Sequence, residues 1–251
     1  MKRVIDMSRI EFMNIHIDNV TTQEALEKIT YLVENTKKSY VVTPNVDHIV
    51  KLQQDNEFLE IYKNASLILT DGQPLIWISK LYGKPIKEKI SGSDLFPKAC
   101  ELAADKGYKM FFLGAAEGVA DIAAQKLTAK YPGLDVIGTY SPQMGFENDP
   151  DELKKIIEII NELSPDILIV ALGAPKQEKF FYRHKEQLNV SLALMIGASL
   201  DFEAGIVKRC PPWMSRYGLE WFYRLCMEPK RMFKRYLIDD MKIIELTWKY
   251  R

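Results

Sequence analysis

The sequence predicts an α/β protein in which a Rossmann-like, mostly parallel sheet is flanked by helices and followed by a basic helical appendage at the C-terminus. Short apolar runs rich in β-forming residues alternate with helix-period stretches about every 25 to 35 residues, the pattern of βαβ units. The chain has 251 residues, 47% of them hydrophobic, with only 13 Gly and 12 Pro. This composition allows a sizeable core and excludes a disordered, collagen-like or disulfide-scaffold protein.

Each predicted strand is a short apolar run rich in β-branched or aromatic residues. The runs lie at residues 40–42, 67–69, 109–113, 135–139, 167–171 and 192–196, and a further N-terminal run covers residues 10–17. Helical stretches separate most of these runs, so we expect the strands to pair in parallel.

Five predicted helices show apolar residues at three- and four-residue spacings. Several of them follow Asp or Ser and end at Gly or Pro, which are typical helix boundaries. They lie at residues 46–64, 95–106, 119–130, 150–163 and 176–187.

The N-terminus and the cysteines indicate a cytoplasmic protein. Residues 1–12 include five charged side chains, so they lack the continuous apolar core of a signal peptide. Three Cys cannot all pair, which fits a reducing compartment. The longest uncharged apolar runs, at 167–175 and 190–200, are shorter than the roughly 20 residues that a membrane span needs.

Basic and aromatic residues gather near the C-terminus of a chain with no net charge. Residues 208–235 contain eight Lys or Arg but two Glu, together with six aromatic residues and three Met. Such a segment indicates an anionic partner with an apolar component, and a solvated basic helix docked on the core is the alternative. We therefore divide the chain into an α/β core, residues 1–207, and a basic, aromatic, membrane-proximal appendage, residues 208–251.

Three arginines of the appendage are spaced to share one helix face. Arg224, Arg231 and Arg235 are seven and four residues apart. Pro229 is expected to kink or restart the helix, which loosens the alignment of Arg224 with the other two. Guanidinium groups brought close together suit a diphosphate, because each can form bidentate hydrogen bonds.

Asp71 is the leading candidate for a catalytic base. It follows the apolar run 65–70 and precedes Gly72, so its carboxylate lies at a strand end. Partial desolvation there would raise its pKa toward the working pH, as removal of a proton from a hydroxyl group requires. A simple turn aspartate explains the same dipeptide equally well.

Polar side chains follow other predicted strands. Thr43 and Asn45 could hydrogen-bond a sugar or phosphate, although a helix cap is the more common role of such an Asn. Lys176 and Gln177 follow the small-residue turn at 173–175 and offer donors to an anionic ligand. Asp201 could accept the two ribose hydroxyl groups, or it could be a solvated turn residue.

The turn at Gly114 and Ala115 could bring a pyrophosphate close to backbone N–H groups. However, both the G-x-G-x-x-G and the G-x-x-x-x-G-K-[ST] patterns are missing. A tight strand-to-helix turn that needs small residues for packing is an equally good interpretation. The missing glycine pattern also disfavours a nicotinamide-dependent dehydrogenase.

Neither a metal site nor a bound cofactor is predicted. The three His residues are far apart in sequence, and no pair of Cys has ligand spacing. Asp149 and Asp151 match a D-x-D pattern, but they open a strongly helical stretch and are better explained as an N-cap.

Taken together, these strings resemble the WecG/TagA/CpsF family of bacterial glycosyltransferases (glycosyltransferase family 26), whose members include N-acetylmannosaminyltransferases. The resemblance extends from residue 15 to about residue 237. The most specific strings are Thr43-Pro44-Asn45, Asp71-Gly72, Phe112-Leu113-Gly114-Ala115, Gly173-Ala174-Pro175-Lys176-Gln177-Glu178, and Gly218-Leu219-Glu220-Trp221 through Glu228-Pro229-Lys230-Arg231.

The resemblance implies an inverting, metal-independent enzyme that moves a sugar from a UDP-sugar, such as UDP-N-acetylmannosamine or a related hexose donor, to a polyprenyl-diphosphate-linked sugar. The reaction would take place at the inner face of the bacterial cell membrane, during assembly of a surface polysaccharide or teichoic acid. No nucleic-acid partner is implied, and a homo-oligomer is left open.

The resemblance also assigns roles to residues of this chain. It implies that Asp71 is the base, that Thr43, Asn45 and Gln177 are polar active-site residues, and that Asp201 contacts the nucleotide. The arginines of the appendage, including Arg224, Arg231 and Arg235, would contact the lipid diphosphate as the appendage closes over the site.

Lys89 is a further expected substrate-binding residue. It stands where relatives often carry Arg, and it keeps the charge but loses the planar fork. The alternative to an enzyme is a non-catalytic nucleotide-binding regulatory module whose basic tail binds membrane or nucleic acid.

Overall fold

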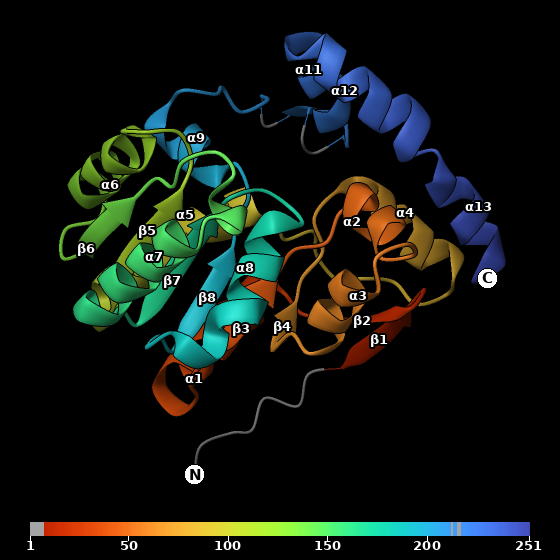
Figure 1. Cartoon of the computed structure of the whole chain (residues 1–251). Helices are drawn as coiled ribbons and strands as arrows, with labels where there is room; N and C mark the ends of the chain where they lie inside the picture. The colour runs from red at the N-terminus through yellow and green to blue at the C-terminus, as the bar shows by residue number, and fades with distance from the viewer. Residues whose placement is uncertain (1–7, 212, 215–216) are drawn as a thin grey trace.

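A six-stranded, all-parallel sheet forms the centre of a computed structural model of the chain (Figure 1). The structure describes residues 8–211, 213–214 and 217–251, without the side chains of residues 231 and 237. The strand order is β4-β3-β8-β7-β5-β6. The strands are β3 (Ser39–Val42), β4 (Leu67–Ile68), β5 (Lys109–Gly114), β6 (Asp135–Tyr140), β7 (Ile167–Ala171) and β8 (Leu192–Met195). The six predicted strands and the α/β fold class are confirmed.

The apolar strands form two cores because their side chains alternate between the faces of the sheet. In β7, Leu168 and Val170 belong to one cluster, whereas Ile167 and Ile169 belong to the other. All four side chains are fully buried. Both faces of the sheet must therefore be covered by helices, as is usual for parallel sheets.

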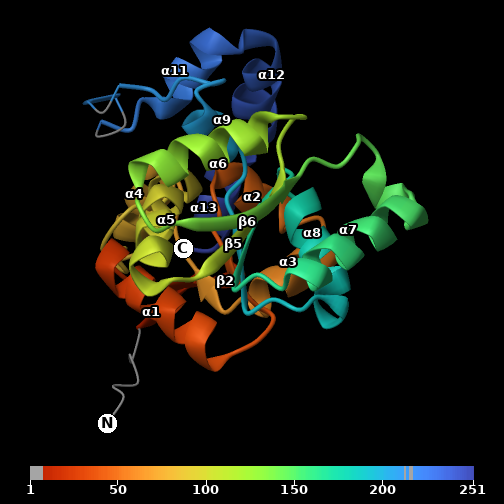
Figure 2. The ribbon, with the colours of Figure 1, turned by 90° about the vertical axis from the view of Figure 1, so that its left-hand side faces the viewer.

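The helices form a layer on each side of the sheet (Figure 2). One layer contains α1 (Thr22–Asn35), α5 (Gly92–Lys106), α6 (Val119–Lys130) and α9 (Ser199–Ala204). The other contains α2 (Val46–Lys51), α3 (Asn56–Lys63), α4 (Gln73–Leu81), α7 (Pro150–Leu163) and α8 (Lys176–His184).

Three predicted helices have different bounds, and three helices of the region before residue 208 were not predicted. Helix α5 begins at Gly92, three residues before the predicted start, because Ser91 caps it. The stretch 46–64 forms α2 and α3 because Asp55 caps a new helix, its side chain accepting a hydrogen bond from the backbone N–H of Phe58 at 3.0 Å. The stretch 176–187 forms α8 followed by the 3₁₀ turn η2 (Lys185–Gln187). Helices α1, α4 and α9 are additional.

The prediction of one strand at 10–17 is wrong. The chain reverses at Met13, whose φ of 54° is left-handed, and forms the antiparallel hairpin β1 (Arg9–Phe12) and β2 (Ile15–Asp18). The buried carboxylate of Asp18 ties this hairpin to the sheet. It accepts hydrogen bonds at 2.8 Å from the backbone N–H of Ile68 and from the guanidinium of Arg9.

The C-terminal helices lie across the carboxyl ends of the strands (Figure 1). They are α11 (Glu220–Met227), α12 (Pro229–Lys234), the π-helical turn η3 (Arg235–Asp239) and α13 (Lys242–Lys249). The predicted break at Pro229 is confirmed. Leu246 of α13 is buried in the same core as α2, and the hydroxyl of Tyr250 donates to Oε1 of Gln53 at 3.0 Å. The boundary at residue 207 stays a prediction.

Within the described ranges, the structure contains no helix with both the length and the hydropathy of a bilayer span.

We predict that Gly114→Ala destabilises the fold by about 3 kcal/mol. Gly114 has a φ of 117°, and a methyl group there would overlap the backbone carbonyl of Ala171 on the neighbouring strand. Urea denaturation followed by circular dichroism measures the change. Gly83→Ala is the matched control, since Gly83 also has a positive φ but open space around it. That control should cost about 1 kcal/mol. Equal losses in the two variants would contradict the close approach at Gly114.

Candidate active site

A crevice opens beyond the carboxyl ends of β3 and β8. The helix that follows β3, α2, packs on one face of the sheet, whereas the helix that follows β8, α9, packs on the other. Because the loops that follow these neighbouring strands diverge toward opposite faces of the sheet, a space for a ligand lies between them. Thr43 and Gly197 follow these two strands, and both line a cavity there.

Asp71 lies beside this crevice, three residues beyond β4. Its backbone N–H donates to the carbonyl of Pro44 at 2.8 Å, and Gly72, with a φ of 101°, allows α4 to begin immediately afterwards. Burial is the main cause that raises the pKa of Asp71 to about 6, and the nearby carboxylate of Glu220 raises it further. The cations of Arg224 and Lys89 oppose this shift. A carboxylate with such a pKa can serve as a general base near neutral pH.

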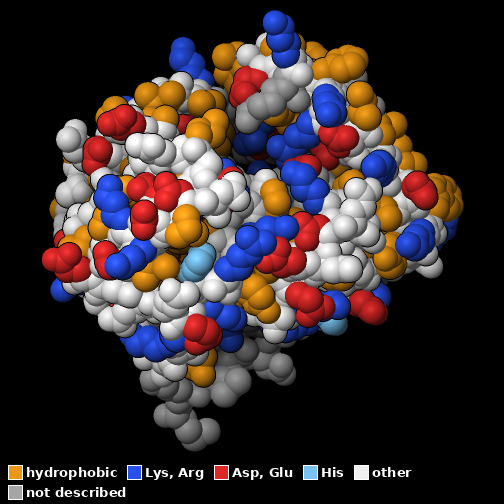
Figure 3. Space-filling model, in the orientation of Figure 1, with side chains coloured by type: hydrophobic (Ala, Val, Ile, Leu, Met, Phe, Trp, Pro, Cys, Tyr) orange, Lys and Arg blue, Asp and Glu red, His pale blue; other side chains and the backbone are white. Residues whose placement is uncertain are grey.

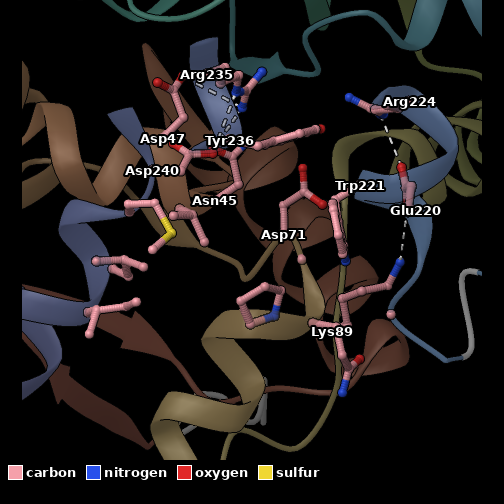
Figure 4. Close-up of a pocket in the computed structure, with 18 residues that line it drawn as sticks. Asn45, Asp47, Asp71, Lys89, Glu220, Trp221, Arg224, Arg235, Tyr236 and Asp240 are labelled. Carbon is pink, nitrogen blue, oxygen red and sulfur yellow. Dashed lines mark hydrogen bonds and ion pairs between the residues drawn. The ribbon is translucent and has the colours of Figure 1, made fainter. Parts of the chain in front are cut away.

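Asn45 is both a helix cap and part of the cavity wall. Its side-chain oxygen accepts a hydrogen bond from the backbone N–H of His48 at 3.2 Å and another from the guanidinium of Arg235 at 3.4 Å. Arg235 also lies 3.6 Å from a carboxylate oxygen of Asp47 and 3.9 Å from one of Asp240 (Figure 4). The first turn of α2 therefore holds an arginine of the C-terminal segment over the site.

Thr43 and Gln177 form the buried wall of the crevice. The hydroxyl of Thr43 donates to the carbonyl of Met195 at 3.5 Å. The amide of Gln177 accepts from the backbone N–H of Gly197 at 3.2 Å and donates to Glu178 at 2.8 Å. Burial raises the pKa of Glu178 to about 7. Glu178, in the first turn of α8, is fully inside the protein.

Alternating charges connect α11 to the core on the other side of Asp71. Glu220 lies 3.1 Å from Arg224 and 4.0 Å from Lys89, so one carboxylate is shared by two cations (Figure 4). Lys89 also pairs with Asp94 at 3.2 Å, and Asp94 accepts from Arg209. These pairs bring Lys89 and Arg224 to the pocket that contains Asp71.

Three adjoining cavities surround these residues. In Figure 3 the surface of the molecule is hollowed beneath the C-terminal helices, and Lys and Arg side chains lie on the walls of this hollow. The apolar pocket, of about 350 Å³, and the polar cavity, of about 390 Å³, share Asn45, Asp71 and Arg235. The outer cavity, of about 1120 Å³, contains Asp201. Arg224 lines all three. Asp71 therefore stands between the apolar pocket and the polar cavity.

Most of the sequence-predicted residues come together here, but some do not. The backbone N–H of Ala115 donates to the carbonyl of Ala171 at 3.0 Å, and neither Gly114 nor Ala115 lines any of the three cavities. Lys176 also lies outside them and forms an ion pair with Glu147 at 2.8 Å. The substrate contacts predicted for these three residues stay predictions. The substrate contact predicted for Arg231 depends on its side chain, which lies outside the part of the chain that the structure describes.

Several lining residues were not predicted: Asp47, Glu220, Trp221, Tyr236 and Asp240. The clearest sequence signal for Glu220 is that it is one of two Glu residues among eight Lys or Arg in residues 208–235. No local pattern marks Asp240, because its role depends on how the π-helical turn η3 places Arg235.

Within residues 8–211, 213–214 and 217–251, no group of three or more His, Cys, Asp or Glu side chains is arranged to hold a metal ion.

Comparison with known proteins identifies the family of this chain. A family model described as "Glycosyl transferase WecG/TagA/CpsF family" matches residues 10–251. The chain belongs to this family of glycosyltransferases. The resemblance stated from the sequence and the prediction of an enzyme are thereby confirmed.

Three relatives of this glycosyltransferase are named N-acetylglucosaminyldiphosphoundecaprenol N-acetyl-beta-D-mannosaminyltransferase. The protein of Bacillus spizizenii is 35% identical over 202 residues, 80% of this chain and 76% of its own. That of Bacillus subtilis is 32% identical over 212 residues, 84% and 79% of the two chains. A Staphylococcus aureus protein is 27% identical over 227 residues, 90% and 87% of the two chains.

We predict that Asp71→Asn stabilises the folded protein above pH 6. The pKa of Asp71 is raised in the folded state, so the folded protein holds this proton more tightly than the unfolded chain does. Ionisation therefore costs stability as the pH rises from about 4 to 6, and the neutral amide avoids the cost. Urea denaturation should show a gain of about 1 to 3 kcal/mol at pH 8, which shrinks toward pH 5.

The matched control is Asp135→Asn at the exposed start of β6, which removes the same charge away from the cavities. A stability difference between wild type and Asp71→Asn that did not change with pH would contradict the raised pKa.

Proposed function

We propose that this protein is an inverting, metal-independent glycosyltransferase that transfers N-acetylmannosamine, or a related hexose, from a UDP-sugar to a polyprenyl-diphosphate-linked sugar. The observation that carries the proposal is the place of Asp71 between a mainly apolar pocket and a polar cavity, with Arg224 and Arg235 lining both. The acceptor, with its apolar tail, would occupy the apolar pocket, and the anionic donor would occupy the polar cavity. The two substrates would then meet at the carboxylate of Asp71. The names of the relatives, which specify a diphosphoundecaprenol acceptor, agree with such a division.

In this proposal the donor occupies the polar and outer cavities. Arg224 lines both cavities, so its guanidinium can bind a diphosphate that extends from one cavity into the other. Asp201, in the outer cavity, would accept the hydroxyl groups of the ribose. Gln177 and Thr43 would contact the sugar at the floor of the polar cavity.

Asp71 acts as the general base. It takes the proton of the acceptor hydroxyl while that oxygen attacks the anomeric carbon of the donor. The bond from this carbon to the diphosphate oxygen breaks on the opposite face, and the nucleoside diphosphate leaves with the bonding electrons. An α-linked donor would then give a β-linked product, and the relatives are named as beta-D-mannosaminyltransferases.

Charge on the departing diphosphate would be stabilised by side-chain cations. Arg224 lies close enough to Asp71 to influence its pKa, and Arg235 lines the polar cavity together with both of them. Fixed cations in a partly desolvated site stabilise developing charge without reorganising during the reaction. They supply the electrostatic stabilisation that a divalent ion provides in metal-dependent transferases.

The proposed location is the inner face of the cell membrane. Trp221, Phe222, Met227 and Phe233 of α11 and α12 are exposed. Lysines accompany them along α12. Exposed aromatic side chains beside cations are typical of segments that bind the surface of an anionic membrane.

We predict that Asp71→Asn lowers turnover by about two to four orders of magnitude, because the amide cannot accept the acceptor proton. Nucleotide release in the presence of donor and acceptor measures turnover, and calorimetry with UDP tests donor binding. Binding should be largely retained, since Asp71 acts on the acceptor. In the wild type, kcat/KM should rise with pH toward a plateau above about pH 6, where Asp71 is ionised. Near-normal turnover of Asp71→Asn would remove Asp71 as the base.

We predict that a chelator leaves turnover unchanged, because Lys89, Arg224 and Arg235 carry the positive charge at the site. The assay compares turnover in excess EDTA with turnover in added Mg²⁺ or Mn²⁺. Loss of activity in EDTA that either ion restores would show that the reaction depends on a metal.

A further inference from the structure

We propose that a groove between α4 and α13 holds the first prenyl units of the acceptor's lipid tail. This inference rests on the proposed function and assigns one part of the acceptor to one surface. We call this surface the α4–α13 groove, and define it by Pro74, Trp77 and Leu81 on the α4 side and Met241, Ile244 and Trp248 on the α13 side.

The inner end of the groove is part of the site. Pro74 at the start of α4 and Met241 and Ile244 at the start of α13 line the apolar pocket together with Asp71. Figure 4 shows Asp71 near the centre of this pocket, with Arg235 and Arg224 around it. An acceptor hydroxyl at Asp71 therefore has apolar walls on one side and cations above it.

The two helices continue outward from the pocket side by side. At the far end of α4, the hydroxyl of Tyr82 donates to the carbonyl of Thr247 in α13 at 3.1 Å. The starts of both helices thus meet at the pocket, and their ends are joined by this hydrogen bond. Along α4, Pro74, Trp77 and Leu81 are three and four residues apart and share one face.

The same spacing repeats on the other wall. Met241, Ile244 and Trp248 are also three and four residues apart, whereas Leu246 of the same helix faces the core. Their side chains are 49%, 52% and 66% exposed, and those of Trp77 and Leu81 are 52% and 51% exposed. Large apolar side chains so exposed along two adjacent helices mark a binding surface rather than a packed interior.

The charged side chains at the inner end of the α4–α13 groove indicate which kind of ligand it would hold. The apolar walls begin where Lys89, Arg224 and Arg235 lie, each within 4.0 Å of a carboxylate. A ligand with an anionic group inside, where it would compete with these carboxylates for the cations, and an apolar chain outside would suit both parts of the surface. A prenyl diphosphate has this arrangement, with its charge at one end of an unbranched run of isoprene units. The acceptor's diphosphate would lie against Lys89, which lines the apolar pocket but neither of the cavities proposed for the donor, and the first prenyl units would lie along the groove.

The direct test is binding of farnesyl diphosphate and of inorganic diphosphate to the full chain, measured by calorimetry. Farnesyl diphosphate should bind the wild type at least tenfold more tightly, since burial of about 60 Å² of apolar surface supplies a factor of ten. Ile244→Asp should abolish this advantage while diphosphate binding persists. Ile122→Asp, on the surface of α6 and remote from the groove, is the matched control and should keep it.

Ile244→Ser serves the same purpose if the aspartate variant does not fold, as judged by circular dichroism. An advantage of less than twofold in the wild type, or an advantage that survives both substitutions at Ile244, would overturn the proposal. Loss of vesicle binding or of self-association in Ile244→Asp, with the farnesyl advantage intact, would instead assign the groove to the membrane surface or to a second copy of the chain.

A transfer assay separates this inference from the proposed function. Two acceptors carry the same sugar diphosphate, one with an ethyl tail and one with a prenyl tail. The ratio of their kcat/KM values should fall about tenfold in Ile244→Asp and stay unchanged in Ile122→Asp. If neither acceptor is glycosylated by the wild type, the proposed function fails, and farnesyl diphosphate binding still decides whether the groove holds a prenyl chain.

Discussion

The balance of forces on the carboxylate of Asp71 governs the whole site. Burial at the end of β4 disfavours its charge, and Glu220 adds repulsion, whereas Arg224 and Lys89 favour it. Neither influence alone would suit a base: strong desolvation would keep the group protonated, and strong pairing would make it too weak to accept a proton. Because the shift is intermediate, the group can be ionised at neutral pH and still accept a proton from a hydroxyl.

The cations that oppose burial are themselves held by carboxylates. Glu220 and Asp94 flank Lys89, and Asp47 and Asp240 flank Arg235. Each acid keeps a cation beside the cavities. A diphosphate would compete for the same guanidinium and ammonium groups, with more charge and more acceptor oxygens. The ion pairs therefore dock the C-terminal helices on the core, and in the proposed function they also present charge to a substrate.

The local parts of the molecule could be predicted from the sequence. Continuous apolar runs such as 167–171 and helix-period stretches such as 150–163 located the sheet and its helices, because these patterns arise within a few residues. Asp71, Thr43, Asn45 and Gln177 were found because parallel strands end at one edge of a sheet. The hairpin at Met13 was missed, since a left-handed non-glycine residue leaves little trace in sequence.

The sequence by itself thus determined the order of strands and helices, the candidate base and the concentration of cations near the C-terminus. Only the tertiary structure decided which of those cations reach Asp71. Arg224 lies close enough to influence the pKa of Asp71, and Arg235 lines the same pocket. Lys176, a cation predicted from its place at a helix start, instead pairs with Glu147 outside the cavities. The physical reason is that a charge acts over a few ångströms in space, whatever its distance along the chain. The packing of α13 on the core brings the end of the chain back over residues from its first half.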